Sequence, residues 1–165
     1  MNPQDYRTYR ANKIESALLY QDFVIDLLFD TVGLVVVQYA SRAYQYAKGE
    51  SRTGVEIKHD EKYQQTRNLW IEVSEKAHPR LGDYAPSGVY RQDNAWLYVI
   101  GDYETVFGFP KRLLQALARS DRYPLLENGT KTSKGFLLPD ADAQRYAAFV
   151  LRPCNGNRAP LTFLD

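Results

Sequence analysis

Two short segments with a strict alternation of apolar and polar residues constrain the fold of this chain most. In residues 54–60 and 69–76, aliphatic side chains occupy every second position and mostly charged or polar side chains occupy the positions between them. A period of two indicates β-strands with one buried face and one polar face. The polar residues 61–68 between them form a stretch short enough for a hairpin connection. The sequence therefore predicts an antiparallel pair of strands at the centre of the chain.

The remaining segments predict helices around a sheet. Residues 12–29 indicate a helix with Asn12 as N-cap and Glu15 three residues later. Its expected buried residues are Ile14, Leu18, Ile25 and Leu28. Further strands are expected over 34–37, 95–100, 105–109 and 136–138, further helices over 111–119 and 139–151, and a loop or short helix with a loop over 41–53. The expected fold class is α/β, with a central mixed sheet of about four to five strands flanked by helices.

Length and composition favour one domain without a membrane segment. A chain of 165 residues predicts a single domain, with its core over about 12–151. No apolar run approaches the roughly 20 residues that cross a bilayer, and the first residues do not resemble a signal peptide. A single cysteine, Cys154, excludes an internal disulfide and a cysteine zinc site, which favours a reducing, cytoplasmic setting. A net charge of +1 is compatible with a nuclease, whose metal-binding acids and phosphate-binding bases can cancel.

The polar face of the expected hairpin carries the candidate chemistry. Pairing about residues 65–67 would place Asp60 opposite Glu72 and Lys58 opposite Ser74. Two carboxylates opposite one another, with Cβ atoms about 4.5–5.5 Å apart, destabilise a sheet. A divalent cation reverses this, because Mg²⁺ or Mn²⁺ binds carboxylates and water, activates a water and holds a phosphate oxygen. With an ammonium on the same face to stabilise the developing charge, the pattern predicts phosphodiester hydrolysis.

This arrangement resembles the PD-(D/E)XK nuclease superfamily over about residues 12–110. The twelve residues from Asp60 to Glu72 are similar to the spacing in its Holliday-junction-resolvase branch. The stretches 54–76, 87–91 and 96–101 also look like uncharacterised proteins of phages and prophages. The resemblance implies a restriction-endonuclease-like fold and a metal-dependent endonuclease for DNA in a bacterial host or phage-infected cell, with pairing as a homodimer. It also implies that Glu15 supports the ion and that the carbonyl of Val73 completes the coordination.

One departure from the family pattern leaves alternatives open. The family lysine stands two residues after the second acid, where this chain has Ser74. Lys58 or Lys76 could take its place. A second assignment makes Glu56–Lys58 the acid-x-lysine element, with Glu50 as the first acid. A further alternative is an inactive member that retained the fold as a nucleic-acid-binding or interaction module.

Basic and aromatic residues supply candidate nucleic-acid contacts. Thirteen tyrosines and two tryptophans are many for this length, and such rings either cover the edge of the core or stack on bases. The candidates are Arg42, Tyr44, Tyr46, Lys48 and Arg52 in one segment, with Lys76, Lys131 and Lys134 elsewhere. A plain surface loop is the alternative for the first group. His59 is expected on the apolar face of its strand, as a core or interface histidine rather than a catalytic base.

Overall fold

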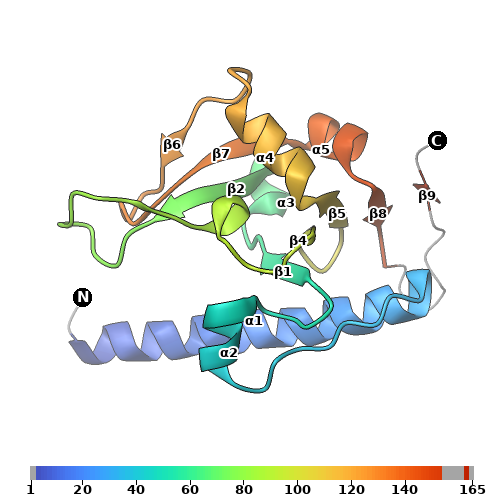
Figure 1. Ribbon diagram of the computed structural model, residues 1–165, viewed down its shortest axis with the longest axis horizontal. Helices are drawn as coiled ribbons and strands as arrows, with labels where there is room; N and C mark the ends of the chain where they lie inside the picture. Colours follow the sequence, from blue (N-terminus) through green and yellow to red (C-terminus); the bar gives the residue numbers. More distant parts are fainter. Residues whose placement is uncertain (1–2, 154–161, 164–165) are drawn as a thin grey trace.

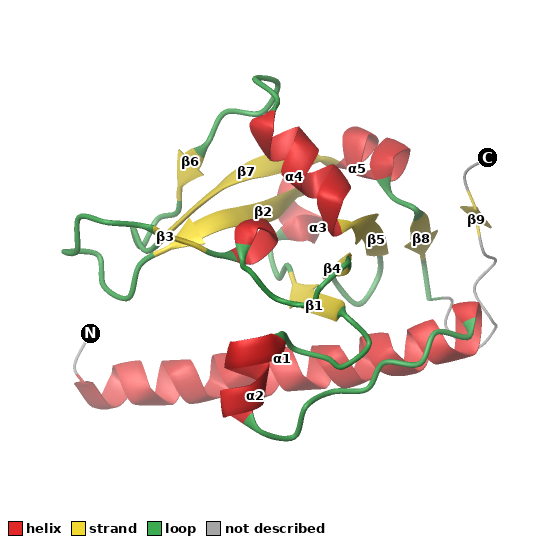
Figure 2. Ribbon diagram, viewed as in Figure 1, coloured by secondary structure: helices red, strands yellow, loops and turns green. Residues whose placement is uncertain are grey.

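The computed structural model describes residues 3–153 and 162–163, which form two β-sheets and surrounding helices (Figures 1 and 2). The first sheet has the order β1-β4-β5-β8-β9 and the second has the order β3-β2-β7-β6. The helices are α1 (Pro3–Val32), α2 (Arg42–Lys48), α3 (Tyr63–Thr66), η1 (Gly88–Tyr90), α4 (Lys111–Arg119) and α5 (Asp140–Tyr146). The strands are β1 (Val55–His59), β2 (Asn68–Glu75), β3 (Ala85–Pro86), β4 (Leu97–Gly101), β5 (Val106–Pro110), β6 (Leu126–Glu127), β7 (Ser133–Pro139), β8 (Phe149–Leu151) and β9 (Thr162–Phe163).

The first sheet is mixed, because β1 runs parallel to β4 while β4, β5, β8 and β9 pair antiparallel. The predicted fold class, a mixed sheet of four to five strands flanked by helices, is therefore confirmed. The second, antiparallel sheet was not predicted. It lies on the opposite side of the first sheet from α1, which runs below β1 in Figure 1. Among the described residues, no helix is long and apolar enough to cross a membrane.

The predicted hairpin of residues 54–60 and 69–76 is wrong. β1 is an edge strand beside β4, whereas β2 pairs with β7 and β3, so that Glu72 lies opposite Gly135 rather than Asp60. The physical reason is that the two strands bury their aliphatic faces in different cores. The aliphatic side chains of β1 pack against α1, and those of β2 pack between the sheets. Between the strands, α3 and the left-handed residue Arg67 (φ 52°) lead the chain from one sheet to the other.

Helix α1 is longer than predicted, and its buried stripe agrees with the prediction only in part: Leu28 is fully buried and Ile25 packs against the core, as expected. It begins at Pro3, which suits a first helical turn, so Asn12 is not its N-cap. The fully buried side chains are Tyr20, Val24 and Leu28, spaced four residues apart, whereas Leu18 is 50% exposed. They pack on aliphatic residues of β1, β4 and β5 and form one of two cores. The predicted stripe member Ile14 lies outside the residues whose side chains are described.

The second core fills the space between the two sheets. Tyr63, Leu69, Phe107, Phe109 and Phe136 are fully buried there, together with aliphatic side chains of α4. Full burial of such a side chain contributes roughly 1.5–3 kcal/mol relative to exposure. This core holds the sheets face to face and therefore fixes how residues of β1 and β2 lie across from one another.

Five other predicted elements differ in outcome. The strands at 95–100 and 105–109 and the helix at 111–119 are confirmed as β4, β5 and α4. Residues 34–37 are not a strand, and a single bridge from Gln38 to Ser51 follows them. The last helix ends at Tyr146 rather than near 151, because Ala147 turns extended and the next residues pair with β5 as β8.

Candidate active site

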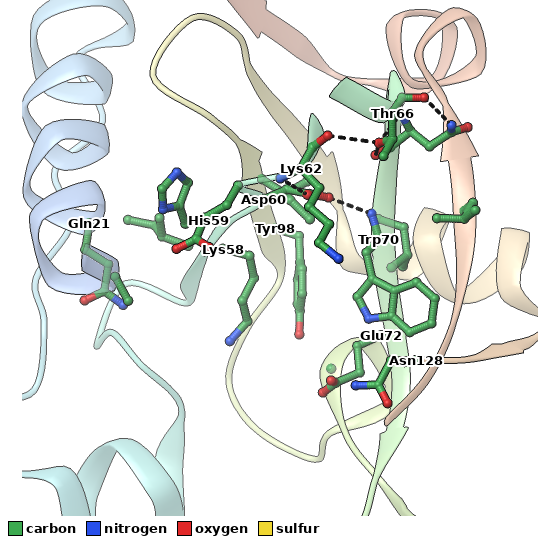
Figure 3. A pocket seen from close by; sticks show the side chains of 18 of the residues that line it. Gln21, Lys58, His59, Asp60, Lys62, Thr66, Trp70, Glu72, Tyr98 and Asn128 are labelled. Atoms are coloured by element: carbon green, nitrogen blue, oxygen red, sulfur yellow. Dashed lines mark hydrogen bonds between the residues drawn. The ribbon is translucent and has the colours of Figure 1, made fainter. Parts of the chain in front are cut away.

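A cleft of about 670 Å³ opens between α1, the β1 edge of the first sheet and β2. Figure 3 shows Lys58 and Tyr98 extending in the same direction from neighbouring strands, with Glu72 across from them on β2. Lys58, Asp60 and Glu72, singled out from the sequence, thus line one cleft. They reach it from two sheets rather than from one hairpin.

Two glutamates share one lysine at this cleft. The Nζ atom of Lys58 lies 2.6 Å from Oε1 of Glu56 and 3.3 Å from Oε1 of Glu50. The Oε2 atom of Glu50 also accepts bonds from Nε2 of Gln21 on α1 at 3.3 Å and from the backbone N–H of Ile57 at 3.2 Å. The structure therefore brings together the acids and the lysine of the second assignment, Glu50 with Glu56–Lys58. We call these three residues the acid–lysine cluster.

The alternation within β1 explains this cluster. Val55 and Ile57 face α1, so Glu56 and Lys58 face the second sheet. Glu56 lies opposite Tyr98 of β4, and its side chain is only 2% exposed. A carboxylate that deeply buried requires a cation beside it, and Lys58 supplies one. Because β1 is the edge strand, the far side of Lys58 opens to the cleft.

Two buried polar atoms beside the cluster have no hydrogen-bond partner among the described residues. They are Oε2 of Glu56 and the hydroxyl oxygen of Tyr98. A buried polar atom without a partner costs about 1–3 kcal/mol, so nearly all such atoms in native proteins are satisfied. Two of them on adjacent strands indicate a position that a water or an ion can occupy.

Burial changes the acid–base properties of the cleft. Burial raises the pKa of Glu56 above its ordinary value, although Lys58 opposes the shift. Burial alone would lower the pKa of Lys58, but the charges of Glu50 and Glu56 outweigh it and keep the ammonium protonated. Burial also raises the pKa of Glu72, although the hydroxyl of Ser87 donates to its Oε1 at 2.8 Å. The cleft thus combines a protonated lysine with two glutamates whose pKa values are raised.

Asp60 holds the backbone rather than facing a second acid across a ladder. Its Oδ1 accepts the N–H of Lys62 at 3.1 Å and its Oδ2 accepts the N–H of Trp70 at 2.8 Å (Figure 3). These bonds tie the end of β1 to the start of β2 across α3. Burial raises the pKa of Asp60, with both backbone bonds opposing the shift. The geometry makes Asp60 a connector of the two sheets.

The other predicted metal ligands lie apart from the acid–lysine cluster. Glu15 is exposed, and α1 lines the cleft with Ala17 and Gln21 instead. The side chain of Val73 is buried between the sheets, and its carbonyl accepts the N–H of Ser87 at 3.1 Å. Gln21 was missed by the sequence analysis, because an amide among apolar helical residues carries no signal of its own.

The predicted nucleic-acid contacts fall into two surface groups. Arg42, Tyr44, Tyr46, Lys48 and Arg52 are exposed on and after α2. Lys76 and Lys134 flank the ring of Tyr84 on the second sheet, with Nζ atoms 4.5 and 4.4 Å from its centroid, and the carbonyl of Lys131 accepts the Tyr84 hydroxyl at 3.3 Å. His59 stacks on Tyr20, with ring centroids 4.3 Å apart, but it is half-buried and lines the cleft rather than lying inside a core.

The described residues contain no group of three or more His, Cys, Asp or Glu side chains arranged to hold a metal ion. Any ion at the cleft would therefore have at most two carboxylate ligands.

Comparisons of the chain with protein-family models, with curated proteins and with solved structures each found no match.

Proposed function

We propose that this protein hydrolyses phosphodiester bonds of DNA with a divalent metal ion, Mg²⁺ or Mn²⁺, bound at the acid–lysine cluster. One observation carries the proposal: Glu50 and Glu56 converge on a single cation, which is the ammonium of Lys58. Two carboxylates that meet at one cation already have the arrangement that a hard metal ion requires. The cleft in front of them has room for a phosphate.

The residues present fit such an ion. Glu50 and Glu56 offer carboxylate oxygens, and Oε2 of Glu56 has no partner among the described residues. Magnesium commonly binds through one or two carboxylates and completes its shell with water and substrate phosphate, which agrees with the absence of a third acidic ligand in the described part of the chain. When bound, the ion would activate a water and neutralise charge on the phosphate.

The side chains around the ion have separable tasks. Lys58, whose side chain is 42% exposed, can turn from the glutamates toward a phosphate oxygen and stabilise the charge that develops there. Gln21 and the N–H of Ile57 keep Glu50 in place. Glu72, with its raised pKa, lies across the cleft as a candidate to accept a proton from the attacking water.

The same arrangement supports the resemblance to PD-(D/E)XK nucleases under the second assignment. Glu56–Lys58 reads as acid-x-lysine on one strand, so the serine at position 74 is no longer a departure. The proposed setting is the cytoplasm of a bacterial host or phage-infected cell, where DNA is available.

Nicking of supercoiled plasmid tests the proposal. Wild type should nick the plasmid with Mg²⁺ or Mn²⁺, and nicking should stop when the metal is chelated. Glu56→Gln and Lys58→Met should each reduce the rate at least about 100-fold. This is the range seen when a group that stabilises a transition state is removed. Glu75→Gln, an exposed acid at the end of β2, is the matched control and should retain activity. If Glu56→Gln retained activity and a folded Glu72→Gln lost it, the metal site would instead be the one first expected from the sequence, at Asp60 and Glu72.

A non-catalytic role is the second candidate, because Lys58 neutralises both glutamates without a metal. In that event wild type would not nick plasmid under any divalent ion. It would still shift the mobility of DNA at low salt, and the shift would fade as salt rises.

A further inference from the structure

A second hollow of about 1050 Å³ lies between the end of α2, residues 90–96 and the start of α4. We propose that this hollow, here called the tryptophan groove, binds a single-stranded segment of nucleic acid by stacking a base on Trp96. The inference rests on the proposed function, because it names the form of substrate that reaches the acid–lysine cluster.

Trp96 is anchored and yet exposed. Its Nε1 donates to the carbonyl of Thr53 at 2.8 Å, while 56% of the residue remains accessible. Gly54 makes this possible, since a Cβ there would lie 2.5 Å from Cδ1 of the indole. An exposed indole that is already fixed in place loses little freedom when a base stacks on it, and such stacking tolerates any base.

The exposed charge of the groove is positive. Lys48 and Arg112 line it with exposed side chains, and no carboxylate of the described residues forms an ion pair with either. The acid among the described lining residues, Asp93, has a side chain that is 1% exposed, and its Oδ1 lies 2.6 Å from Nζ of Lys111. Its charge is therefore neutralised inside the protein, and the two cations can contact phosphates.

A second exposed aromatic ring, Tyr46, contacts Arg91, which lines the groove. The guanidinium of Arg91 donates to the carbonyls of Gln45 and Tyr46 at 2.7 Å, and its Cζ lies 5.6 Å from the centroid of the Tyr46 ring. Tyr46 is 83% exposed. Two accessible rings with cations beside them are the features of surfaces that bind single strands. Bases within an intact duplex are stacked on each other and do not offer a free face to Trp96.

A short segment of chain connects the groove to the acid–lysine cluster. Lys48 lines the groove, and Glu50, two residues later, lines the cleft. The connecting chain is fixed by Asn94, whose N–H donates to the carbonyl of Lys48 at 3.0 Å and whose Nδ2 donates to the carbonyl of Ser51 at 2.8 Å. A strand held in the groove would therefore place its neighbouring phosphates near Glu50.

Fluorescence anisotropy of a labelled oligothymidine tests the inference. Binding is measured in EDTA at low salt, so that the result does not depend on cleavage. We expect Trp96→Ala to weaken binding about tenfold, within the range for loss of one stacked base. Trp96→Phe should retain most of the affinity. Arg112→Ala should also weaken binding and reduce its salt dependence. Arg119→Ala, an exposed arginine at the other end of the same helix, is the matched control and should bind as wild type does.

The two proposals fail in different ways. Equal affinity of wild type, Trp96→Ala and Arg112→Ala for the oligothymidine would overturn the tryptophan groove, even if plasmid nicking requires Glu56. Equal weakening in Arg112→Ala and Arg119→Ala would also overturn it, because binding would then follow overall charge. Loss of affinity confined to the groove variants would support it, even in a protein that does not nick DNA.

Discussion

Glu56 is the residue on which the chemistry of the cleft depends. It is 1% exposed, it has one oxygen on Lys58, and its other oxygen has no partner among the described residues. A buried carboxylate remains ionised only beside a cation, whether a lysine or a metal ion. We therefore expect the interaction between Glu56 and Lys58 to contribute to the stability of β1 and, under the proposed function, to govern the binding of an ion.

The first prediction concerns this pair. Lys58→Met should lower the free energy of unfolding by about 2 kcal/mol, because it leaves the charge of Glu56 buried without its cation. The figure is below that for a fully buried pair because Lys58 is partly exposed. The double variant Glu56→Gln/Lys58→Met should recover part of the loss. Urea denaturation at pH 7 measures the three values, and a double variant less stable than Lys58→Met alone would contradict the account.

The second prediction concerns Asp60, which the structure makes a connector. Asp60→Ala leaves the backbone N–H groups of Lys62 and Trp70 without their acceptor. The expected loss is about 1–3 kcal/mol of unfolding free energy. Glu61→Ala, an exposed neighbour, should change stability by less than about 0.5 kcal/mol and serves as the control. Equal effects of the two variants in thermal denaturation would show that Asp60 does not connect the sheets.

The third prediction concerns the pH dependence of Glu72. Burial raises the pKa of Glu72 in the folded protein, so the folded state binds more protons than the unfolded state between the two pKa values. Ionisation of Glu72 therefore lowers the stability of the folded protein as the pH rises above 4.5, the ordinary pKa of this carboxyl group. Glu72→Gln should accordingly be more stable than wild type at pH 7, with the difference shrinking toward pH 4. Melting temperatures across this range decide it, and a constant difference would be inconsistent with a raised pKa.

At the scale of elements, α1 and β1 are held together by a ring contact as well as by aliphatic side chains. His59 stacks on Tyr20 at 4.3 Å and meets Tyr103 edge-on at 5.3 Å. Burial lowers the pKa of His59, although Glu61, Asp102 and Asp60 oppose the shift. The neutral imidazole is the form that fits between the strand and the helix.

The fourth prediction follows from the lowered pKa of His59. The unfolded chain takes up a proton near pH 6.5 while the folded protein does so only at lower pH, so this histidine lowers stability as pH falls from 6.5 through its folded pKa. His59→Phe keeps a ring on Tyr20 and should flatten the curve of melting temperature between pH 7 and 5. A variant with the same slope as wild type would show that another group causes it.

Local sequence signals were sufficient to predict several strands and helices. They were not sufficient to predict which strands pair, because pairing depends on contacts between distant segments. The strands predicted over 95–100 and 105–109 and the helix predicted over 111–119 were found as expected, with Gly101 at the end of β4 and Pro110 directly before α4. Alternation correctly identified β1 and β2 as strands. It could not reveal their partners, because the aliphatic faces of both strands fit any apolar core of suitable shape. The hairpin was wrong for that reason.

In the candidate site, too, some residues could be predicted from the sequence and others could not. Lys58, Asp60 and Glu72 were placed in one site from their spacing, and they do line one cleft. The meeting of Glu50 with Glu56 and Lys58 appeared only as the second assignment, since it requires β1 to be an edge strand beside Tyr98. Gln21 and the tryptophan groove depend on contacts between distant segments, which no local pattern carries.

At the scale of the whole molecule, the cleft exists because three bodies meet. α1 contributes Gln21, the first sheet contributes the acid–lysine cluster, and the second sheet contributes Glu72. One core packs α1 against the first sheet and the other packs the two sheets together, so the two cores fix the relative positions of the three parts. A ligand bound at this junction should therefore stabilise the domain as a unit, by about 2.7 kcal/mol at a concentration 100 times its dissociation constant.

Calorimetric titration with Mn²⁺ tests the central claim most directly, because it measures the ion at the cluster without requiring cleavage. We expect wild type to bind Mn²⁺ at one site in each chain, Glu50→Gln and Glu56→Gln to lose that site, and Asp60→Asn to keep it. Binding of Mn²⁺ by Glu56→Gln with the affinity of wild type, or loss of binding in a folded Asp60→Asn alone, would contradict the assignment of the metal to Glu50 and Glu56.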